Sequence, residues 1–179
     1  MSDQIVFMSN VRLSFPHIAE PQKQQGDNGE RISYNAEFIT TPNDPAFTNF
    51  MRVVGEIAQA KWTHQTPGVM QMIYADRKKR CFGGGAEKIN GKTFLPYDGY
   101  EGMVYITAGR DQMPQIIDPQ GAAVDPANTL ACQALARKMY GGCRVNAAVK
   151  PWLQENKHGR GVRCDLVAVQ FLADDTPFG

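Results

Sequence analysis

The sequence lacks the patterns that identify most enzymes and metalloproteins. It contains no Walker loop, no GxGxxG after a strand, no HExxH and no GxSxG. Its four cysteines form no CxxC pair and have no histidine at a zinc-ligand spacing, so we expect free thiols that pack as small apolar residues. The three histidines have no nucleophile or carboxylate partner in the local sequence. These absences predict a protein that is not an enzyme and that needs no metal or other cofactor.

Long apolar runs are also missing. No stretch approaches the roughly 18 residues that a membrane helix needs, and the opening MSDQIVFMSN lacks the basic flank and apolar core of a signal peptide. We therefore expect a cytoplasmic protein with no membrane partner. The chain has 179 residues, 42% of them hydrophobic and 21% charged, which is typical of one globular domain. No linker or repeat divides it, so we expect a single domain over 1–179 with a short acidic tail at 173–179.

Strand patterns dominate the chain that is present. Apolar and polar residues alternate, with the period of a half-buried strand, in 5–18, 31–40, 103–110, 143–152 and 161–173. Two segments have helical spacing instead: 45–62, which Asp44 caps, and 127–140. Short antiparallel strands with helices inserted between them predict a mainly β, α+β fold. The order of elements best fits an OB-fold-like antiparallel β-barrel.

Basic residues are concentrated in two blocks, although the net charge is only +1. Residues 76–92 carry six basic and two acidic groups, and residues 131–164 carry seven and one. If the fold brings the blocks together, they form one positive groove. The cations that we expect to hold phosphates are Arg77, Lys78, Lys79, Arg80, Arg144 and Lys150, with Arg12 at the border of the groove.

Aromatic residues are interleaved with both basic blocks. Single-stranded nucleic acid is bound by a positive groove together with rings on which bases stack. We expect Phe82, Tyr105 and Trp152 to stack bases, with Tyr97 and Tyr100 as weaker candidates. A solvated loop remains the alternative for Arg77–Arg80, and core packing remains the alternative for Tyr105 and Trp152. The glycines 83–85 indicate either a turn or bulge or a place where a ligand backbone comes close.

The tail LADDTPFG places two carboxylates before Pro-Phe. This pattern resembles the partner-docking tip of bacterial single-stranded-DNA-binding proteins, in which carboxylates meet basic residues and a Phe fills a pocket. The corresponding candidates are Asp174, Asp175 and Phe178. The tail differs from that pattern because it ends in Gly179 and follows no flexible linker. A frayed end of the last strand is the alternative.

Five stretches form a recognisable set: FMSNVRLSFPHI, RISYNAEFIT, the helix ending in AKW, the basic stretch before CFGGG, and YGGCRVNAAVKPW with GVRCDLVAVQF. Together they resemble a bacteriophage family of single-stranded-DNA-binding proteins that was formerly a domain of unknown function. The resemblance covers nearly the whole chain in order. It implies an OB fold and binding of single-stranded DNA without sequence preference. It also implies a role in phage replication or recombination in the cytoplasm of an infected bacterial host.

Two other functions fit the same residues. A strand-annealing recombination protein would share the charge pattern but would form large rings or filaments. An interaction or virion-structural module would have no affinity for nucleic acid. Replication or recombination proteins that bind the tail are further candidate partners, and a homo-oligomer is left open.

Overall fold

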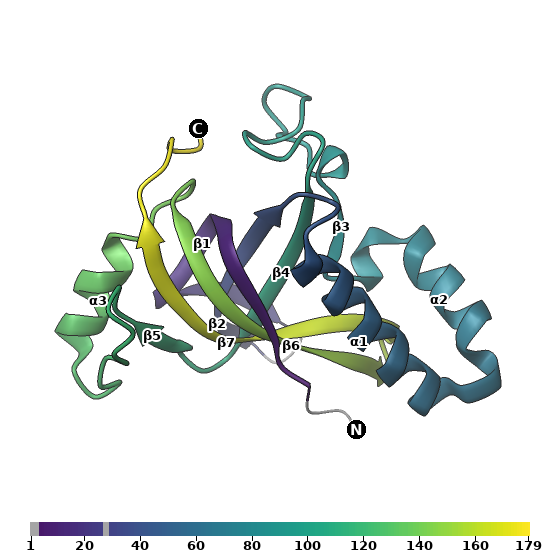
Figure 1. The fold of residues 1–179 in the computed structure, drawn as a ribbon. Helices are drawn as coiled ribbons and strands as arrows, with labels where there is room; N and C mark the ends of the chain where they lie inside the picture. Colours follow the sequence, from purple (N-terminus) through teal and green to yellow (C-terminus); the bar gives the residue numbers. More distant parts are fainter. Residues whose placement is uncertain (1–3, 27–28) are drawn as a thin grey trace.

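Seven strands form one sheet in the order β3-β4-β2-β1-β6-β7-β5, and the helices lie around it (Figure 1). The computed structural model describes residues 4–26 and 29–179. The strands are β1 Val6–Gly26, β2 Gly29–Thr40, β3 Phe82–Gly84, β4 Val104–Arg110, β5 Gln115–Ile117, β6 Arg144–Asn156 and β7 Gly159–Ala173. The helices are α1 Pro45–Trp62, α2 Thr66–Ala75 and α3 Thr129–Arg137, with the 3₁₀ turns η1 Thr63–Gln65, η2 Arg77–Lys79 and η3 Gly85–Glu87.

Two long antiparallel hairpins build most of the sheet. β1 pairs with β2, β6 pairs with β7, and β1 joins the hairpins by pairing with β6 over Val6–Arg12. The expected mainly β fold with inserted helices is confirmed. One detail differs from the antiparallel prediction, because β5 adds to β7 in parallel. The tip of the β1–β2 hairpin falls partly outside the described residues.

The sheet curls so that the segment before β3 meets β7. A parallel bridge joins Arg80, just before β3, to Val162 in β7, and the same segment is held to β4, where the backbone N–H of Thr107 donates to the carbonyl of Cys81 at 2.6 Å. We call this junction, residues 80–82 against 162–164, the seam. Cys81 and Cys164 lie on its two sides and are both buried. All four cysteines are free and buried, as expected.

The helices cover the core. Phe50, Val54 and Ile57 of α1 are buried at helical spacing, and Asp44 accepts a hydrogen bond from the backbone N–H of Ala46, so the predicted cap and helix are confirmed. α2, which the sequence indicates only weakly, continues from η1 and delivers the chain to the basic segment at η2. In α3, which the side chain of Asn128 caps, Cys132 and Leu135 are buried, whereas Leu130 is 79% exposed.

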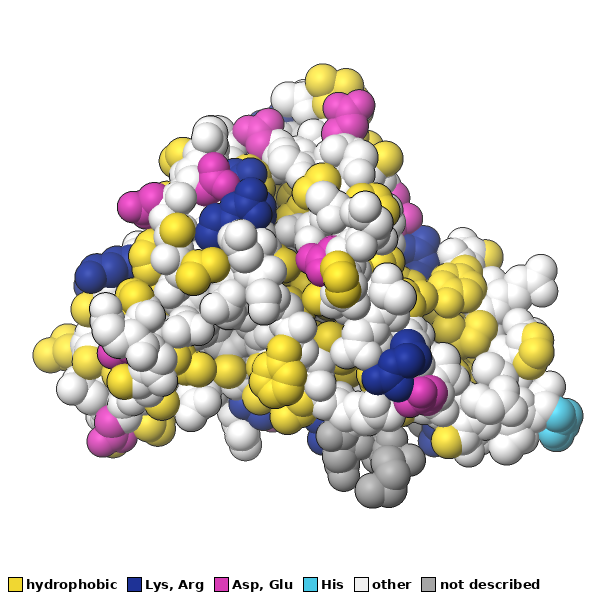
Figure 2. All heavy atoms as spheres, in the orientation of Figure 1, with side chains coloured by type: hydrophobic (Ala, Val, Ile, Leu, Met, Phe, Trp, Pro, Cys, Tyr) yellow, Lys and Arg dark blue, Asp and Glu magenta, His cyan; other side chains and the backbone are white. Residues whose placement is uncertain are grey.

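Gly83 and Gly85 serve the chain's own packing, whereas a Cβ at Gly84 would meet nothing within 4 Å. A Cβ at Gly85 would lie 1.8 Å from the backbone oxygen of Tyr100, and one at Gly83 would meet the side chains of Glu87 and Arg80. At Gly85 the missing Cβ therefore allows a close approach of the loop 88–103, which returns the chain to β4. This loop carries exposed hydrophobic residues, Phe94 and Leu95, and stands out from the sheet at the top of Figures 1 and 2.

Candidate nucleic-acid interface

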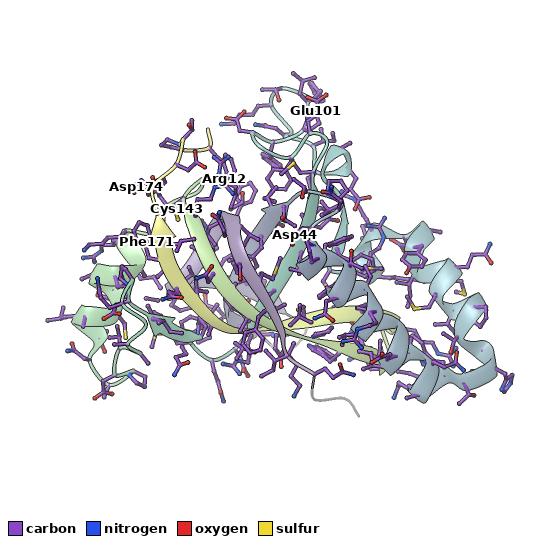
Figure 3. All side chains as sticks on the ribbon, in the orientation of Figure 1. Arg12, Asp44, Glu101, Cys143, Phe171 and Asp174 are labelled. Carbon is purple, nitrogen blue, oxygen red and sulfur yellow. The ribbon has the colours of Figure 1, made fainter. Side chains whose placement is uncertain are left out.

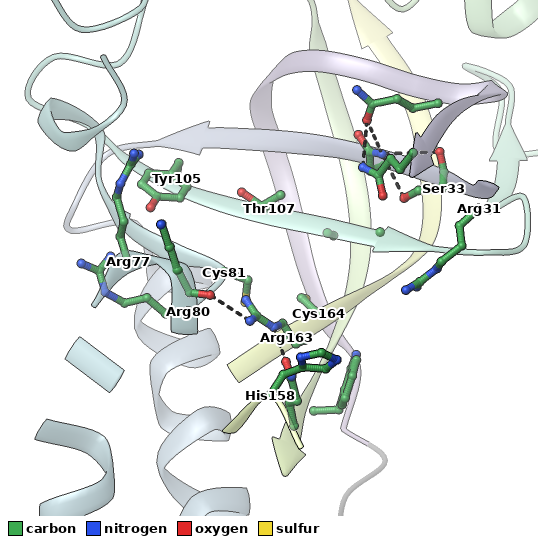
Figure 4. A pocket seen from close by; sticks show the side chains of 18 of the residues that line it. Arg31, Ser33, Arg77, Arg80, Cys81, Tyr105, Thr107, His158, Arg163 and Cys164 are labelled. Atoms are coloured by element: carbon green, nitrogen blue, oxygen red, sulfur yellow. Dashed lines mark hydrogen bonds between the residues drawn. The ribbon is translucent and has the colours of Figure 1, made fainter. Parts of the chain in front are cut away.

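A groove of about 780 Å³ opens on the sheet between the two long hairpins. The β1–β2 hairpin contributes Arg31, Ser33 and Asn35, β4 supplies the floor with Tyr105 and Thr107, and β6 and β7 form the opposite side (Figure 4). The turn η2 and the residues after it close one end. The groove is therefore assembled from segments that are far apart in the sequence.

The lining of this groove is strongly basic. Six of its residues are arginine or lysine, and none of the lining residues that the structure describes is acidic. These cations are Arg31, Arg77, Lys78, Arg80, Lys88 and Arg163. A concave surface lined by one sign of charge raises the local potential and attracts a polyanion.

Two of the six cations are neutralised by carboxylates just behind the lining. Arg80 makes a two-pronged ion pair with Glu87, with nitrogen–oxygen distances of 2.5 and 3.0 Å, and also donates to the carbonyl of Phe82. The hydrogen bond to Glu87 raises the pKa of Arg80. Burial raises the pKa of Glu87, but hydrogen bonds from Arg80 and the Tyr105 hydroxyl outweigh it, so this pKa lies below its ordinary value. Arg80 is thus committed to the wall of the groove.

Lys88 is held in the same way. Its Nζ lies 2.8 Å from Oε2 of Glu37, a carboxylate that also accepts hydrogen bonds from the hydroxyls of Tyr100, at 2.5 Å, and Thr107, at 3.2 Å. Burial raises the pKa of Tyr100 far above its ordinary value, and the neighbouring Glu37 charge adds to the rise. Glu37 is itself buried. A buried carboxylate with three donors is satisfied, so this network supports the floor of the groove.

Arg77 and Lys78 are exposed cations at the end of the groove. Asp76 follows the end of α2 in an extended conformation and accepts a hydrogen bond from the backbone N–H of Lys78 at 3.0 Å, which starts the η2 turn. The Arg77 guanidinium donates to the carbonyl of Glu87 at 3.5 Å. Arg77 and Lys78 are both exposed. This short capped turn places two side chains of the basic run at the end of the groove.

The run of four cations is divided by the fold. Arg77, Lys78 and Arg80 line the groove, but Lys79 lies in a separate, largely apolar pocket with Ile73 of α2. Lys79 was expected to hold phosphate with the rest of the run, but it does not line this groove. Successive side chains of a tight turn point in different directions, so a basic run cannot present all its charges to one face.

Trp152 is the expected stacking residue that the structure leaves available. It lies on β6, lines the groove and is 40% exposed. Lys150 lies two residues before it on the same strand, opposite Asp165 of β7, and is not among the residues that line the groove. An exposed indole beside guanidinium and ammonium groups matches the chemistry of a base-stacking site.

Phe82 and Tyr105 were expected to stack bases, and their burial contradicts this. Phe82 is 3% exposed, and its ring packs edge-on against Phe50 and Tyr74. Tyr105 is 2% exposed, donates to Glu87 at 2.5 Å and lies under the Lys88 ammonium, 4.6 Å from its ring centroid. Phe82 lies two residues after the basic run, and Tyr105 alternates with the apolar residues Val104 and Ile106, yet the fold turns both rings inward.

Tyr97 and Tyr100 belong to a different cluster. Tyr100 is fully buried, and the two rings pack against each other and against Phe15 on the far side of the Glu37 network. Neither lines the groove. The two weaker stacking candidates therefore lie away from the groove, because the loop that carries them packs against Phe15 in the middle of β1.

Arg12 and Arg144 hold the C-terminal tail rather than the groove. Arg144 Nε donates to Oδ2 of Asp175 at 2.8 Å, and Arg12 Nη2 donates to the carbonyl of Thr176 at 2.6 Å. Arg12 also lies over the Phe178 ring, 4.4 Å from its centroid. Figure 3 shows Arg12 and Asp174 near each other where the tail begins, and Figure 2 shows the basic and acidic side chains adjoining there. The expected meeting of Arg144 with the basic run does not occur.

The tail is docked on the body of its own chain. The Tyr140 hydroxyl donates to Asp174 Oδ1 at 3.0 Å, and the backbone N–H of Phe178 donates to the carbonyl of Gly141 at 2.8 Å. A Cβ at Gly142 would lie 2.3 Å from the carbonyl of Thr176, and one at Gly99 would strike the Phe178 ring at 2.3 Å. Both glycines have positive φ. Asp174, Asp175 and Phe178 therefore have intramolecular partners, and the alternative of a frayed strand end is wrong.

Three of the groove cations were not predicted: Arg31, Lys88 and Arg163. The polar lining residues were also unpredicted: Gln22, Gln24, Ser33, Asn35, Thr107, Gln154, Asn156 and His158. A signal existed for some of them, because Ser33 and Asn35 occupy the polar face of an alternating strand. Among the described residues, no group of His, Cys, Asp or Glu could hold a metal ion, and no helix is long and apolar enough to cross a membrane.

Residues 4–179 match the family model described as Enterobacter phage Enc34, ssDNA-binding protein. The chain belongs to this family. One relative of this chain is protein p50 of Acyrthosiphon pisum secondary endosymbiont phage 1. The two are 29% identical over 177 residues, which is 96% of this chain and 84% of that protein.

Solved structures show the same fold. The single-stranded DNA-binding protein from bacteriophage Enc34 in complex with ssDNA superposes with a TM-score of 0.73 at 22% identity, covering 98% of this chain and 89% of that one. The gp2.5 single-stranded DNA-binding protein encoded by bacteriophage T7 superposes with a TM-score of 0.54 at 12% identity, covering 99% and 90%. At these identities the likeness establishes the fold of the Enc34 family in this chain.

Proposed function

We propose that this member of the Enc34 family binds single-stranded DNA without sequence preference in the groove between its two hairpins. The observation that carries the proposal is the groove itself, in which six cations and no described carboxylate surround an exposed indole. Phosphates are attracted by the cations, and a ring can stack on any base, so such a groove binds a strand regardless of its sequence.

The residues divide into contacts and supports. Arg77 and Lys78 contact phosphates, and Trp152 stacks one base. Arg80 and Lys88 support the wall and floor, because Glu87 and Glu37 already neutralise them. All described elements of the chain contribute to one sheet or its cover, which supports a single binding domain over residues 1–179.

The biological role that follows is protection of single strands exposed while a phage genome is replicated or recombined, in the cytoplasm of the infected bacterium. The role is one of binding rather than catalysis. The family description and the names of the two structural neighbours support it, since each names single-stranded DNA binding.

A tryptophan fluorescence titration tests the proposal. Trp62 is 3% exposed and Trp152 is 40% exposed, so quenching by oligo-dT reports mainly on the groove. We expect saturable quenching by oligo-dT that weakens as salt rises, and weaker binding of duplex of equal length. A strand-annealing protein would in addition speed pairing of complementary strands in an annealing assay. Absence of quenching at low salt would refute the proposal and favour an interaction or virion-structural module.

A further inference from the structure

Arg163 faces the groove, but its guanidinium is engaged on two sides. Its Nε donates to Oε1 of Gln154 at 2.7 Å, and its Nη2 donates to the backbone carbonyl of Lys78 at 2.8 Å (Figure 4). Gln154 belongs to β6 and Lys78 to η2. One side chain of β7 thus ties the β6–β7 hairpin to the basic segment.

The strand beneath Arg163 is shaped to receive that segment. Val162 bridges to Arg80 at the seam, and a Cβ at Gly161 would lie 2.7 Å from the carbonyl of Lys79. Backbone atoms of residues 78–80 therefore rest on residues 161–163, with three separate contacts. The direction in which Lys78 points depends on these contacts, because η2 is a single 3₁₀ turn and its backbone is held against β7.

We infer that Arg163 is a positioning residue, which fixes the carbonyl of Lys78 so that the Lys78 ammonium faces the strand, and that it does not itself hold a phosphate. The inference rests on the proposed single-stranded DNA binding. A guanidinium suits this task because its planar fork donates in two fixed directions, whereas a lysine ammonium is a single point of charge. Arg163 therefore differs in role from Lys78, although both are cations lining one groove.

A double-mutant cycle read out by salt dependence distinguishes the two roles. For single strands, each phosphate contact adds about 0.7 to the slope of log K against log salt. We expect Lys78→Ala and Arg163→Gln each to lower the slope by about 0.7 and the double variant to lower it by about 0.7 in total. If Arg163 holds its own phosphate, the double variant loses about 1.4 instead, and the inference is overturned.

A variant that changes no charge provides an independent test. Gly161→Ala places a methyl group against the carbonyl of Lys79 and displaces the segment, so we expect it to lower the slope by about as much as Lys78→Ala. Arg163→Lys is expected to behave like Arg163→Gln. A wild-type slope in either Gly161→Ala or Arg163→Lys overturns the inference. If Arg163→Gln does not fold, the slope of Gly161→Ala alone tests the inference. Failure of the wild-type protein to bind oligo-dT would instead refute the proposed function.

Discussion

Replacing Trp152 with alanine is the most direct test of how the groove holds bases. Trp152 is the one predicted stacking residue that both lines the groove and remains 40% exposed. One available ring serves one base, and stacking of one base is worth about 1–3 kcal/mol. Since 1.4 kcal/mol corresponds to tenfold in affinity, we expect Trp152→Ala to weaken binding of oligo-dT between about 5-fold and about 140-fold.

The salt dependence of binding should stay at its wild-type value in this variant, because no charge is removed. Fluorescence anisotropy of a labelled oligo-dT is the appropriate assay, since the variant lacks the reporter indole. Phe94→Ala is a matched control: Phe94 is 80% exposed but does not line the groove, so its loss should leave affinity unchanged. Wild type and Trp152→Ala should bind an oligonucleotide with abasic sites with equal affinity, because that strand has no base to stack. Equal affinities of the two proteins for oligo-dT would refute base stacking on Trp152.

Three further predictions follow from the supporting contacts. Tyr105→Phe removes a hydrogen bond to a carboxylate from a buried ring, so urea unfolding should show a loss of about 1.5–3 kcal/mol while affinity for oligo-dT stays within about twofold; a large loss of affinity would mean that Tyr105 contacts DNA. The pKa of Asp175 is lowered by hydrogen bonds from Thr176 and Arg144, so its anchoring of the tail is complete above the ordinary value of 3.8 and is lost as pH falls through the lowered pKa. Hydrogen exchange at the Phe178 amide should show this loss, and Asp175→Asn should abolish the pH dependence. Gly142→Ala combines a positive φ of 111° with a collision against the carbonyl of Thr176, so limited proteolysis should cut the tail faster while oligo-dT binding persists; an unchanged cleavage rate would show that the docked tail tolerates the methyl group.

The local elements of this fold could be predicted because each depends on neighbours in sequence. The cap Asp44 and the helical spacing of Phe50, Val54 and Ile57 specify α1, and alternation specifies the strands. The curl of the sheet could not be predicted in this way. It depends on the bridge between Arg80 and Val162, which are 82 positions apart and carry no shared pattern.

The sequence predicted residues of the candidate site only where a short local segment determines their position. Arg77 and Lys78, which were predicted from their adjacent charges, do line the groove, because the η2 turn exposes them there. Phe82 and Tyr105 were misassigned because alternation gives two faces of a strand, and in a curled sheet with covering helices both faces are buried. Arg144 was misassigned because its partner, Asp175, is 31 residues away in a tail that the sequence presents as free.

The seam has a consequence for how this protein can be followed in solution. Cys81 and Cys164 are buried on its two sides, and burial raises the pKa of the Cys164 thiol, so this sulfur stays protonated and shielded while the two sides of the seam touch. A thiol-reactive dye can modify Cys164 only when the two sides of the seam separate. The labelling rate therefore measures how often the seam opens. A bound DNA strand that contacts both sides of the seam should lower that rate.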